Sequence, residues 1–240
     1  GRVSTKGSEM AETIRLDPQQ SRGSLAPLAQ CYLDALLAAD RGAARRLIFD
    51  AVDDGESLQS IYLDVFQPAL YEVGRRWEIN EITVADEHFC TAATQLIMSE
   101  LYPRIFEQPR CGRSLIAASV SGELHEIGIR MVCDLFEMNG WDAYYVGANT
   151  PADAVVSTAA SRGMDVLGVS ATMQQHVDRV AQLIEAVNRN PELSDLRIMV
   201  GGQPFNESPE LWRQIGAHGC ADRADHAVEL AESWTSPPAA

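Results

Sequence analysis

The residues best suited to chemistry lie in a short loop after an apolar, strand-like run. Glu123 and His125 stand two positions apart there, directly before a helical pattern that contains Gly128. An imidazole can bind a transition metal through one ring nitrogen while a carboxylate holds the other. The second histidine of the zinc-protease motif H-E-x-x-H is missing, and the loop has neither G-K-[ST] nor G-x-G-x-x-G, so a zinc-protease site and a phosphate loop are both excluded.

Two further loops carry small or polar residues after later strand-like runs. Ser170 and Thr172 follow one such run, and Gly201 and Gly202 follow the next. Glycines at these points let a bulky ligand approach the backbone closely. Taken alone, His125 fits an ordinary loop histidine as well as a metal ligand.

The segments that carry these loops alternate between strands and helices. The strand candidates are 114–120, 143–146, 166–169, 197–200 and 219–221, and the helix candidates are 128–139, 151–162, 176–189, 208–215 and 224–233. This alternation predicts a Rossmann-like (flavodoxin-like), doubly wound parallel sheet of five strands over residues 113–235. Such sheets bind ligands at the carboxyl ends of their strands, where the three loops meet.

The preceding segment has helical periodicity instead. It predicts helices over 26–39, 42–53, 57–78 and 83–107, which form a four-helix bundle over residues 26–108. Pro68 and Pro103 fall inside the last two helices, and each is expected to kink or divide its helix because proline has no backbone N–H. Residues 1–25 are interpreted as a tag remnant followed by a disordered tail.

Composition narrows the possible partners. The chain has 240 residues, 46% of them apolar, and a net charge of −15, which argues against a nucleic-acid surface or an anionic membrane. Its five cysteines form no C-x-x-C pair, and no apolar run is long enough to span a membrane. We expect a cytoplasmic protein.

Together, the three loops resemble the cobalamin-binding domain of methionine synthase and methylmalonyl-CoA mutase, with its D-x-H-x-x-G, S-x-L and G-G motifs. In this chain 41 residues separate Gly128 from Ser170, and 28 separate Thr172 from Gly201. The resemblance implies that His125 is the lower axial ligand of cobalt and displaces the dimethylbenzimidazole base of the cofactor. It also implies that the glycines of these loops leave room for the nucleotide tail: Gly128, Gly201 and Gly202.

The same resemblance assigns an outer partner to His125. Glu123 would accept a hydrogen bond from the imidazole, and Ser170 would be the next partner along. The family most often has Asp where this chain has Glu123, so we expect a longer or indirect hydrogen bond to His125. Thr172 replaces the usual Leu.

The helical half contains a second candidate group between two predicted helices. Thr83 is a plausible N-cap with Asp86 three residues later. Trp77, Glu87 and His88 fit the pattern W-x9-E-H, which is characteristic of CarH-type light-dependent regulators and of the related photocobilins, which add a bilin. The alternative is that Trp77 is a core residue, Glu87 interacts with the helix dipole and His88 packs or is solvated.

The CarH-type resemblance implies a light sensor. Trp77 would pack against the 5′-deoxyadenosyl group of adenosylcobalamin, and Glu87 would hold its ribose. After light breaks the cobalt–carbon bond, His88 would bind cobalt opposite His125 and move the bundle. CarH-type regulators carry an N-terminal DNA-binding domain for which too few residues precede the bundle, so we expect signalling through a homo-oligomer or an output protein.

Two other functions stay open. The first is a corrinoid methyl carrier for a methyltransferase, which shares this domain layout, and the second is a cobalamin-responsive antirepressor that binds a transcription factor. We expect a binding protein rather than an enzyme in each case. A second chromophore, biliverdin, would bind covalently at Cys90 or without a covalent bond, although Cys90 also fits a small core residue. His176 lies near the ligand edge, while His218 and His226 are interpreted as surface residues.

Overall fold

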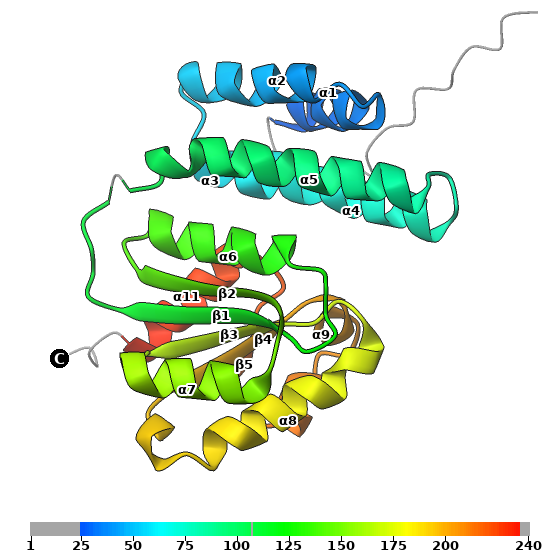
Figure 1. Cartoon of the computed structure of the whole chain (residues 1–240). Coiled ribbons are helices and arrows are strands. Elements are labelled where there is room, and N and C mark those ends of the chain that lie inside the picture. The colour runs from blue at the N-terminus through cyan, green and yellow to red at the C-terminus, as the bar shows by residue number, and fades with distance from the viewer. Residues whose placement is uncertain (1–24, 107, 236–240) are drawn as a thin grey trace, which may run out of the picture. The chain divides into compact units, whose positions relative to one another are not determined.

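The computed structural model describes residues 25–106 and 108–235 (Figure 1). The interpretation of residues 1–25 as a tag and tail falls, apart from Leu25, outside these described residues. The chain divides into two compact units between Cys90 and Thr91. This division lies inside a long helix, so one secondary-structure element contributes residues to both units.

The first unit is helical. Its elements are α1 (Ala26–Leu37), α2 (Arg41–Asp53), α3 (Leu58–Ser60), α4 (Gln67–Glu78) and the first turns of α5 (Val84–Leu101). Helix α1 packs against α2 and α4. Its core includes the buried rings of Tyr32, Tyr62 and Phe66. The centroid of the Phe66 ring lies 5.4 Å from that of Tyr32 and 5.3 Å from that of Tyr62. The predicted N-terminal helix bundle is confirmed.

The prolines act on these helices as predicted. A π-helical turn (Ile61–Phe66) joins α3 to α4, and Pro68, which has no backbone N–H to donate, lies directly after this change of helix type. The fourth helix ends at Leu101, earlier than its predicted end at 107, and a 3₁₀ turn (Tyr102–Arg104) follows. Pro103 cannot donate the hydrogen bond that would continue an α-helix.

Helix α5 begins with a capping box. The Thr83 N–H donates to Asp86 Oδ2 at 2.9 Å, and the Asp86 N–H donates to Thr83 Oγ1 at 3.2 Å. This reciprocal pair satisfies backbone donors that have no partner within the helix. The predicted N-cap at Thr83 is therefore confirmed.

The described part of the second unit contains one five-stranded parallel sheet. The strands are β1 (Ser114–Val120), β2 (Asp142–Thr150), β3 (Val166–Ser170), β4 (Arg197–Gly201) and β5 (Gly219–Cys220). Their order is β2-β1-β3-β4-β5, which is the flavodoxin-like order. The predicted fold class is confirmed. From β1 the next strand, β2, is added on one side of the sheet, and β3 to β5 are added on the other side. The order of strand addition therefore reverses between β1 and β3, the point at which such folds bind ligands.

Helices cover both faces of this sheet (Figure 1). They are α6 (Ile127–Met138), α7 (Ala152–Arg162), α8 (Val177–Asn188), α9 (Gln203–Glu207), α10 (Leu211–Gln214) and α11 (Ala224–Thr235). Helices α7 and α8 lie on one face, and α6 and α11 lie on the other. Alternate strand residues such as Ile116, Leu167 and Ile198 form the core beneath α7 and α8. In neither described range is a helix long and apolar enough to cross a membrane.

Some predicted boundaries are wrong. The helix expected over 208–215 is shortened to α10 at Leu211–Gln214, and the short helix α9 before it was not predicted. Pro209 disfavours a helical backbone at Ser208, whose φ and ψ are −127° and 83°, and so separates the two helices. The second strand runs to Thr150, beyond its predicted end at 146. Its residues are only partly buried along an edge of the sheet, so apolar periodicity marks its end poorly.

Candidate functional site

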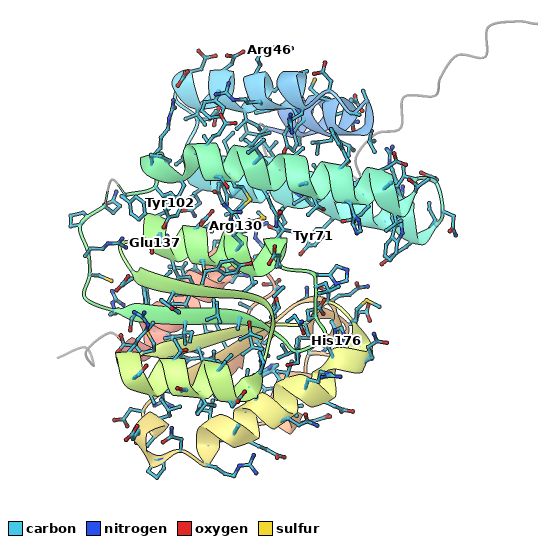
Figure 2. All side chains as sticks on the ribbon, viewed as in Figure 1. Arg46, Tyr71, Tyr102, Arg130, Glu137 and His176 are labelled. Atoms are coloured by element: carbon cyan, nitrogen blue, oxygen red, sulfur yellow. The ribbon has the colours of Figure 1, made fainter. Side chains whose placement is uncertain are left out.

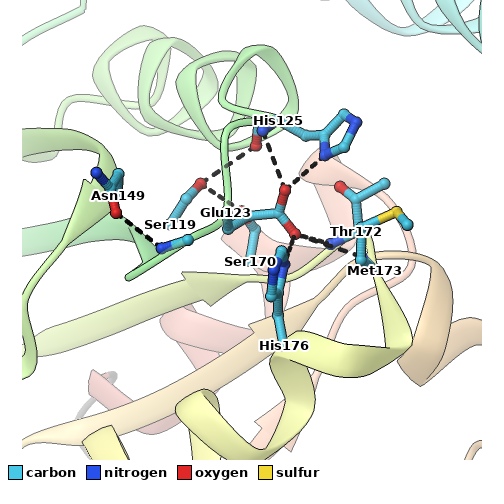
Figure 3. Close-up of polar contacts among 9 residues, drawn as sticks. Ser119, Glu123, His125, Asn149, Ser170, Thr172, Met173 and His176 are labelled. Carbon is cyan, nitrogen blue, oxygen red and sulfur yellow. Dashed lines mark hydrogen bonds and ion pairs between the residues drawn. The ribbon is translucent and has the colours of Figure 1, made fainter.

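Three loops meet at the carboxyl edge of the sheet, as the sequence predicted. The loop after β1 carries Glu123 and His125, and the loop after β3, a strand that ends at Ser170, carries Thr172 (Figure 3). The third loop follows β4 and begins with Gly202, which lies against Ala171. Hydrogen bonds connect the first loop to the second, so these side chains form one polar cluster. The cluster lies at the switch point between β1 and β3.

The contact between Glu123 and His125 is direct. His125 Nδ1 lies 2.5 Å from Glu123 Oε1, and the same oxygen accepts the His125 backbone N–H at 3.0 Å. The expectation of a longer or indirect hydrogen bond is wrong. The longer Glu side chain curls back over its own loop, so its oxygen reaches both the backbone and the ring of the residue two positions later.

The second carboxylate oxygen of Glu123 binds the loop after β3. It accepts the backbone N–H groups of Thr172 and Met173 at 2.8 and 3.3 Å, and it lies 2.9 Å from His176 Nδ1. Glu123 is fully buried. The structure thus adds a histidine to the site that the sequence placed only near the ligand edge, because nothing in its spacing linked it to Glu123.

Ser170 is not the next partner of Glu123. Its Oγ lies 3.0 Å from Ser119 Oγ, and the Ser119 hydroxyl donates to the backbone carbonyl of His125 at 3.3 Å. The expectation for Ser170 is corrected for a simple geometric reason. Ser170 pairs with Ser119 across adjacent strands, while the Glu123 side chain extends toward the start of α8.

The charge of Glu123 is fixed by its surroundings. Burial opposes ionisation, but the hydrogen bonds from the two imidazole rings and from backbone N–H groups outweigh it and hold the pKa of Glu123 well below its usual range. An ionised carboxylate only accepts hydrogen bonds, so both rings donate from Nδ1. A metal bound by His125 would therefore be bound through Nε2. The His125 side chain is 46% exposed, so its ring stands at the surface of the cluster.

Asn149 supports the loop from below. Its Oδ1 accepts the Gly122 N–H at 2.7 Å, and its own N–H donates to the Glu123 carbonyl at 3.0 Å. Asn149 has a φ of 51°, a conformation that Asn tolerates better than most residues. The sequence signal was an Asn before Thr-Pro at a strand end, which marks a turn but names no partner.

The three glycines of the site differ in their surroundings. A Cβ on Gly128 would meet no atom within 4 Å, whereas a Cβ on Gly201 would lie 2.9 Å from the Ala221 carbonyl oxygen. At Gly202, φ is 109° and a Cβ would overlap the Ala171 carbonyl. The chain's own backbone therefore requires Gly201 and Gly202, and it does not require Gly128.

Comparison with known proteins identifies the cofactor. A family model for the B12 binding domain matches residues 113–232, and a second B12 binding domain model matches residues 28–102. The chain belongs to the B12-binding family. Cobalamin, predicted from the loops around His125, is thus the cofactor of this protein.

Relatives of this B12-binding protein include corrinoid proteins and a regulator. A corrinoid protein of Desulfitobacterium hafniense is 27% identical over 82% of this chain and 92% of its own length. Dimethylamine corrinoid protein 2 of Methanosarcina acetivorans is 26% identical over 68% of this chain and 73% of its own. The HTH-type transcriptional repressor CarA of Myxococcus xanthus is 24% identical over 95% of this chain and 74% of its own.

A solved structure shares the fold. The monomethylamine corrinoid protein of Methanosarcina barkeri superposes with a TM-score of 0.77 at 23% identity. The match covers 88% of this chain and 99% of that one. The B12-binding protein therefore has the architecture of a corrinoid protein.

The other predicted group lies in the first unit of the B12-binding protein. Trp77 is next to the last residue of α4, and Glu87 and His88 lie in the first turns of α5. Trp77 is 39% exposed, so the alternative that it is a core residue is wrong. His88 Nε2 lies 3.5 Å from Glu87 Oε2, and the His88 side chain is 75% exposed. Their relation to His125 remains a prediction.

Cys90 is suited to the core rather than to covalent attachment. Burial, with the nearby carboxylates of Glu87 and Asp86, raises the pKa of the Cys90 thiol to about 11. The thiolate is the nucleophile, so this thiol is a poor anchor for a bilin at neutral pH. Of the remaining histidines, His218 and His226 are exposed, as predicted.

Proposed function

We propose that this B12-binding protein is a corrinoid carrier, which holds cobalamin over His125 and presents a methyl group to partner methyltransferases. The Glu123–His125 pair, with its ring held by the carboxylate and partly exposed at the switch point of the sheet, supports the binding of cobalamin, and the similarity to corrinoid proteins is the observation that carries the choice of a carrier. The corrinoid relatives, which align over most of their length, support this function over the light sensor that the W-x9-E-H pattern favours.

The donor set fits the proposed ligation. A neutral imidazole with its Nδ1 proton held by a carboxylate is a good transition-metal ligand, and the carboxylate fixes the plane of the ring. When bound, cobalamin would supply a cobalt centre that accepts and gives up an alkyl group. The chain's own part is to orient His125, to keep the proton on Nδ1 and to leave space beside Gly128.

Gly128 offers a test of that space. We expect Gly128→Ala to leave stability unchanged or to raise it by up to about 1 kcal/mol, because Ala is the better helix former and its methyl meets no protein atom. We also expect cobalamin affinity to fall about tenfold, because the methyl would enter the slot assigned to the nucleotide tail. Urea unfolding and cobalamin titration give the two numbers. Unchanged affinity would show that Gly128 does not border the slot for the nucleotide tail.

Gly201→Ala is the matched comparison. Its Cβ would lie 2.9 Å from a backbone carbonyl, which cannot move aside cheaply. We expect this variant to lose about 1–3 kcal/mol of stability before any cofactor is added. The pair separates a glycine kept for the cofactor from one kept for the fold.

A light-responsive role is the second candidate, and one observation favours it. Trp77, Glu87 and His88 are at least partly exposed and keep the spacing W-x9-E-H, and the regulator CarA aligns with 95% of this chain. In this role the upper ligand would be the 5′-deoxyadenosyl group, and the output would be a change in oligomeric state or in binding to a protein partner. Biliverdin would be a second, non-covalently bound chromophore, with no bond to Cys90.

One set of measurements separates the two functions. Protein purified in darkness is analysed for its bound cobalamin, and protein loaded with adenosylcobalamin is then illuminated, with and without biliverdin. A carrier should contain methylcobalamin, and its illuminated spectrum and elution volume should be the same in wild type and in His88→Ala. A sensor should contain adenosylcobalamin, and the variant should change both the photoproduct and the light-dependent elution volume.

A further inference from the structure

His176 is a buried histidine that the proposed ligation of cobalt does not use. It ends the 3₁₀ turn Gln174–His176 directly before α8, at the carboxyl edge of the sheet (Figure 2). Its side chain is 11% exposed, and its Nδ1 lies 2.9 Å from Glu123 Oε2. The ring therefore faces the carboxylate that holds His125 (Figure 3).

The surroundings fix the position of the His176 ring. A Cβ on Gly122 would lie 3.6 Å from His176 Nε2 and 3.8 Å from Arg179 Cζ, so the ring fits between the Glu123 carboxylate and the turn that precedes it. The backbone N–H groups of Thr172 and Met173 approach the same carboxylate oxygen as His176. Glu123 thus joins two imidazoles, one on each oxygen.

We propose that His176 is a positioning residue that weakens the donation of electrons from His125 to cobalt, acting through Glu123. This inference rests on the proposed ligation of cobalt by His125. A carboxylate that accepts a hydrogen bond has part of its negative charge stabilised and is a weaker base toward its other donors. His176 therefore limits how far Glu123 draws the proton from His125 Nδ1, and so limits the basicity of Nε2.

The alternative partner for Glu123 is already engaged elsewhere. Ser170, which the resemblance assigns to this position, lies beside Ser119, and an imidazole N–H takes its place at Glu123. The backbone donors from the loop after β3 belong to the main chain and remain whatever side chain stands at position 176. The side chain at position 176 is thus the adjustable donor on Oε2.

The consequence is a lower ligand that is easily released. If reduction of cobalt to the +1 state requires release of the lower ligand, a weaker imidazole donor would favour the reduced form. For His176→Phe, which removes the donor, we expect about a threefold shift toward histidine-bound cob(II)alamin. A threefold change corresponds to a midpoint potential about 28 mV more negative for the one-electron cobalt(II)/cobalt(I) couple. For His176→Asn, whose amide N–H replaces Nδ1–H, we expect values near wild type.

The experiment uses the full chain loaded with cobalamin. Absorption and electron paramagnetic resonance spectra of cob(II)alamin report the bound histidine nitrogen, and redox titration gives the potential. An unchanged potential in His176→Phe, or a shift toward the histidine-free form, would overturn the proposal. So would an Asn variant that behaves like Phe. If the Phe variant does not fold, His176→Leu also carries no donor and should shift the potential in the same direction.

Failure of the underlying ligation is separable from failure of this inference. If wild type and His125→Ala give the same cob(II)alamin spectrum, His125 is not the ligand, and the role of His176 falls with it. If only His125→Ala changes the spectrum while His176→Phe leaves the potential as in wild type, the ligation stands and the role of His176 is wrong.

Discussion

Replacement of His125 by alanine is expected to weaken cobalamin binding about 100-fold, or about 2.7 kcal/mol, and to remove the spectrum of histidine-bound cobalt. The His125 ring is the protein ligand assigned to the lower side of the metal, and no other side chain is assigned to that position. His125→Ala also removes a hydrogen bond that offsets the burial of the Glu123 carboxylate, so we expect the apoprotein to lose about 1–3 kcal/mol of stability. Titration with cobalamin and the absorption spectrum measure the two effects.

A matched histidine provides the control for this prediction. His226 lies on α11, is exposed, and contacts Asp222 in the loop before that helix. It has no place in the proposed site, so His226→Ala should bind cobalamin like wild type. Imidazole added to His125→Gly should restore part of the histidine-bound spectrum by filling the ring's place. A His125→Ala protein with the wild-type spectrum would show that the cobalt ligand lies elsewhere.

Glu123→Gln is expected to destabilise the apoprotein by about 2–4 kcal/mol. The carboxylate accepts hydrogen bonds on both oxygens, from two rings and from backbone N–H groups of its own loop and the loop after β3. A glutamine places an NH₂ against some of these donors, so buried N–H groups lose their acceptor. Urea unfolding without cobalamin gives the free energy of unfolding and keeps cofactor binding out of the measurement.

Glu185→Gln is the matched control, because Glu185 is exposed on α8. We expect its free energy of unfolding to stay within about 0.5 kcal/mol of wild type. If Glu123→Gln also falls inside this range, the two-imidazole cluster does not stabilise the loops, and the orientation of His125 depends on something else.

Local signals in the sequence predicted much of the fold because their causes are local. Thr83 forms the predicted N-cap with Asp86, since the two residues stand only three positions apart. Pro68 and Pro103 affect the helix at their own positions, because each lacks a backbone N–H. The end of β2, the helix α9 and the start of α10 were missed. The first depends on burial at a sheet edge, and the two helices are short and are separated at Ser208–Pro209.

The loops around His125 and the pattern around His88 do not give equal information about function. The loops around His125 specify cobalamin, which light sensors and corrinoid carriers share. The pattern around His88 favours a sensor, while the corrinoid relatives favour a carrier. The upper ligand of cobalt would decide between the two functions, and the residues that the CarH-type resemblance assigns to that ligand, Trp77, Glu87 and His88, lie in the first unit.

The sequence by itself determined the cofactor, the parallel sheet and the three loops at its carboxyl edge, because residue type, spacing and strand alternation are all read along the chain. Only the tertiary structure decided which side chains meet there. It put His176, 53 residues away, on Glu123 and placed Ser170 beside Ser119. The physical reason is that parallel strands bring distant loops to one edge, while the direction of each side chain depends on the packing of the loop that carries it.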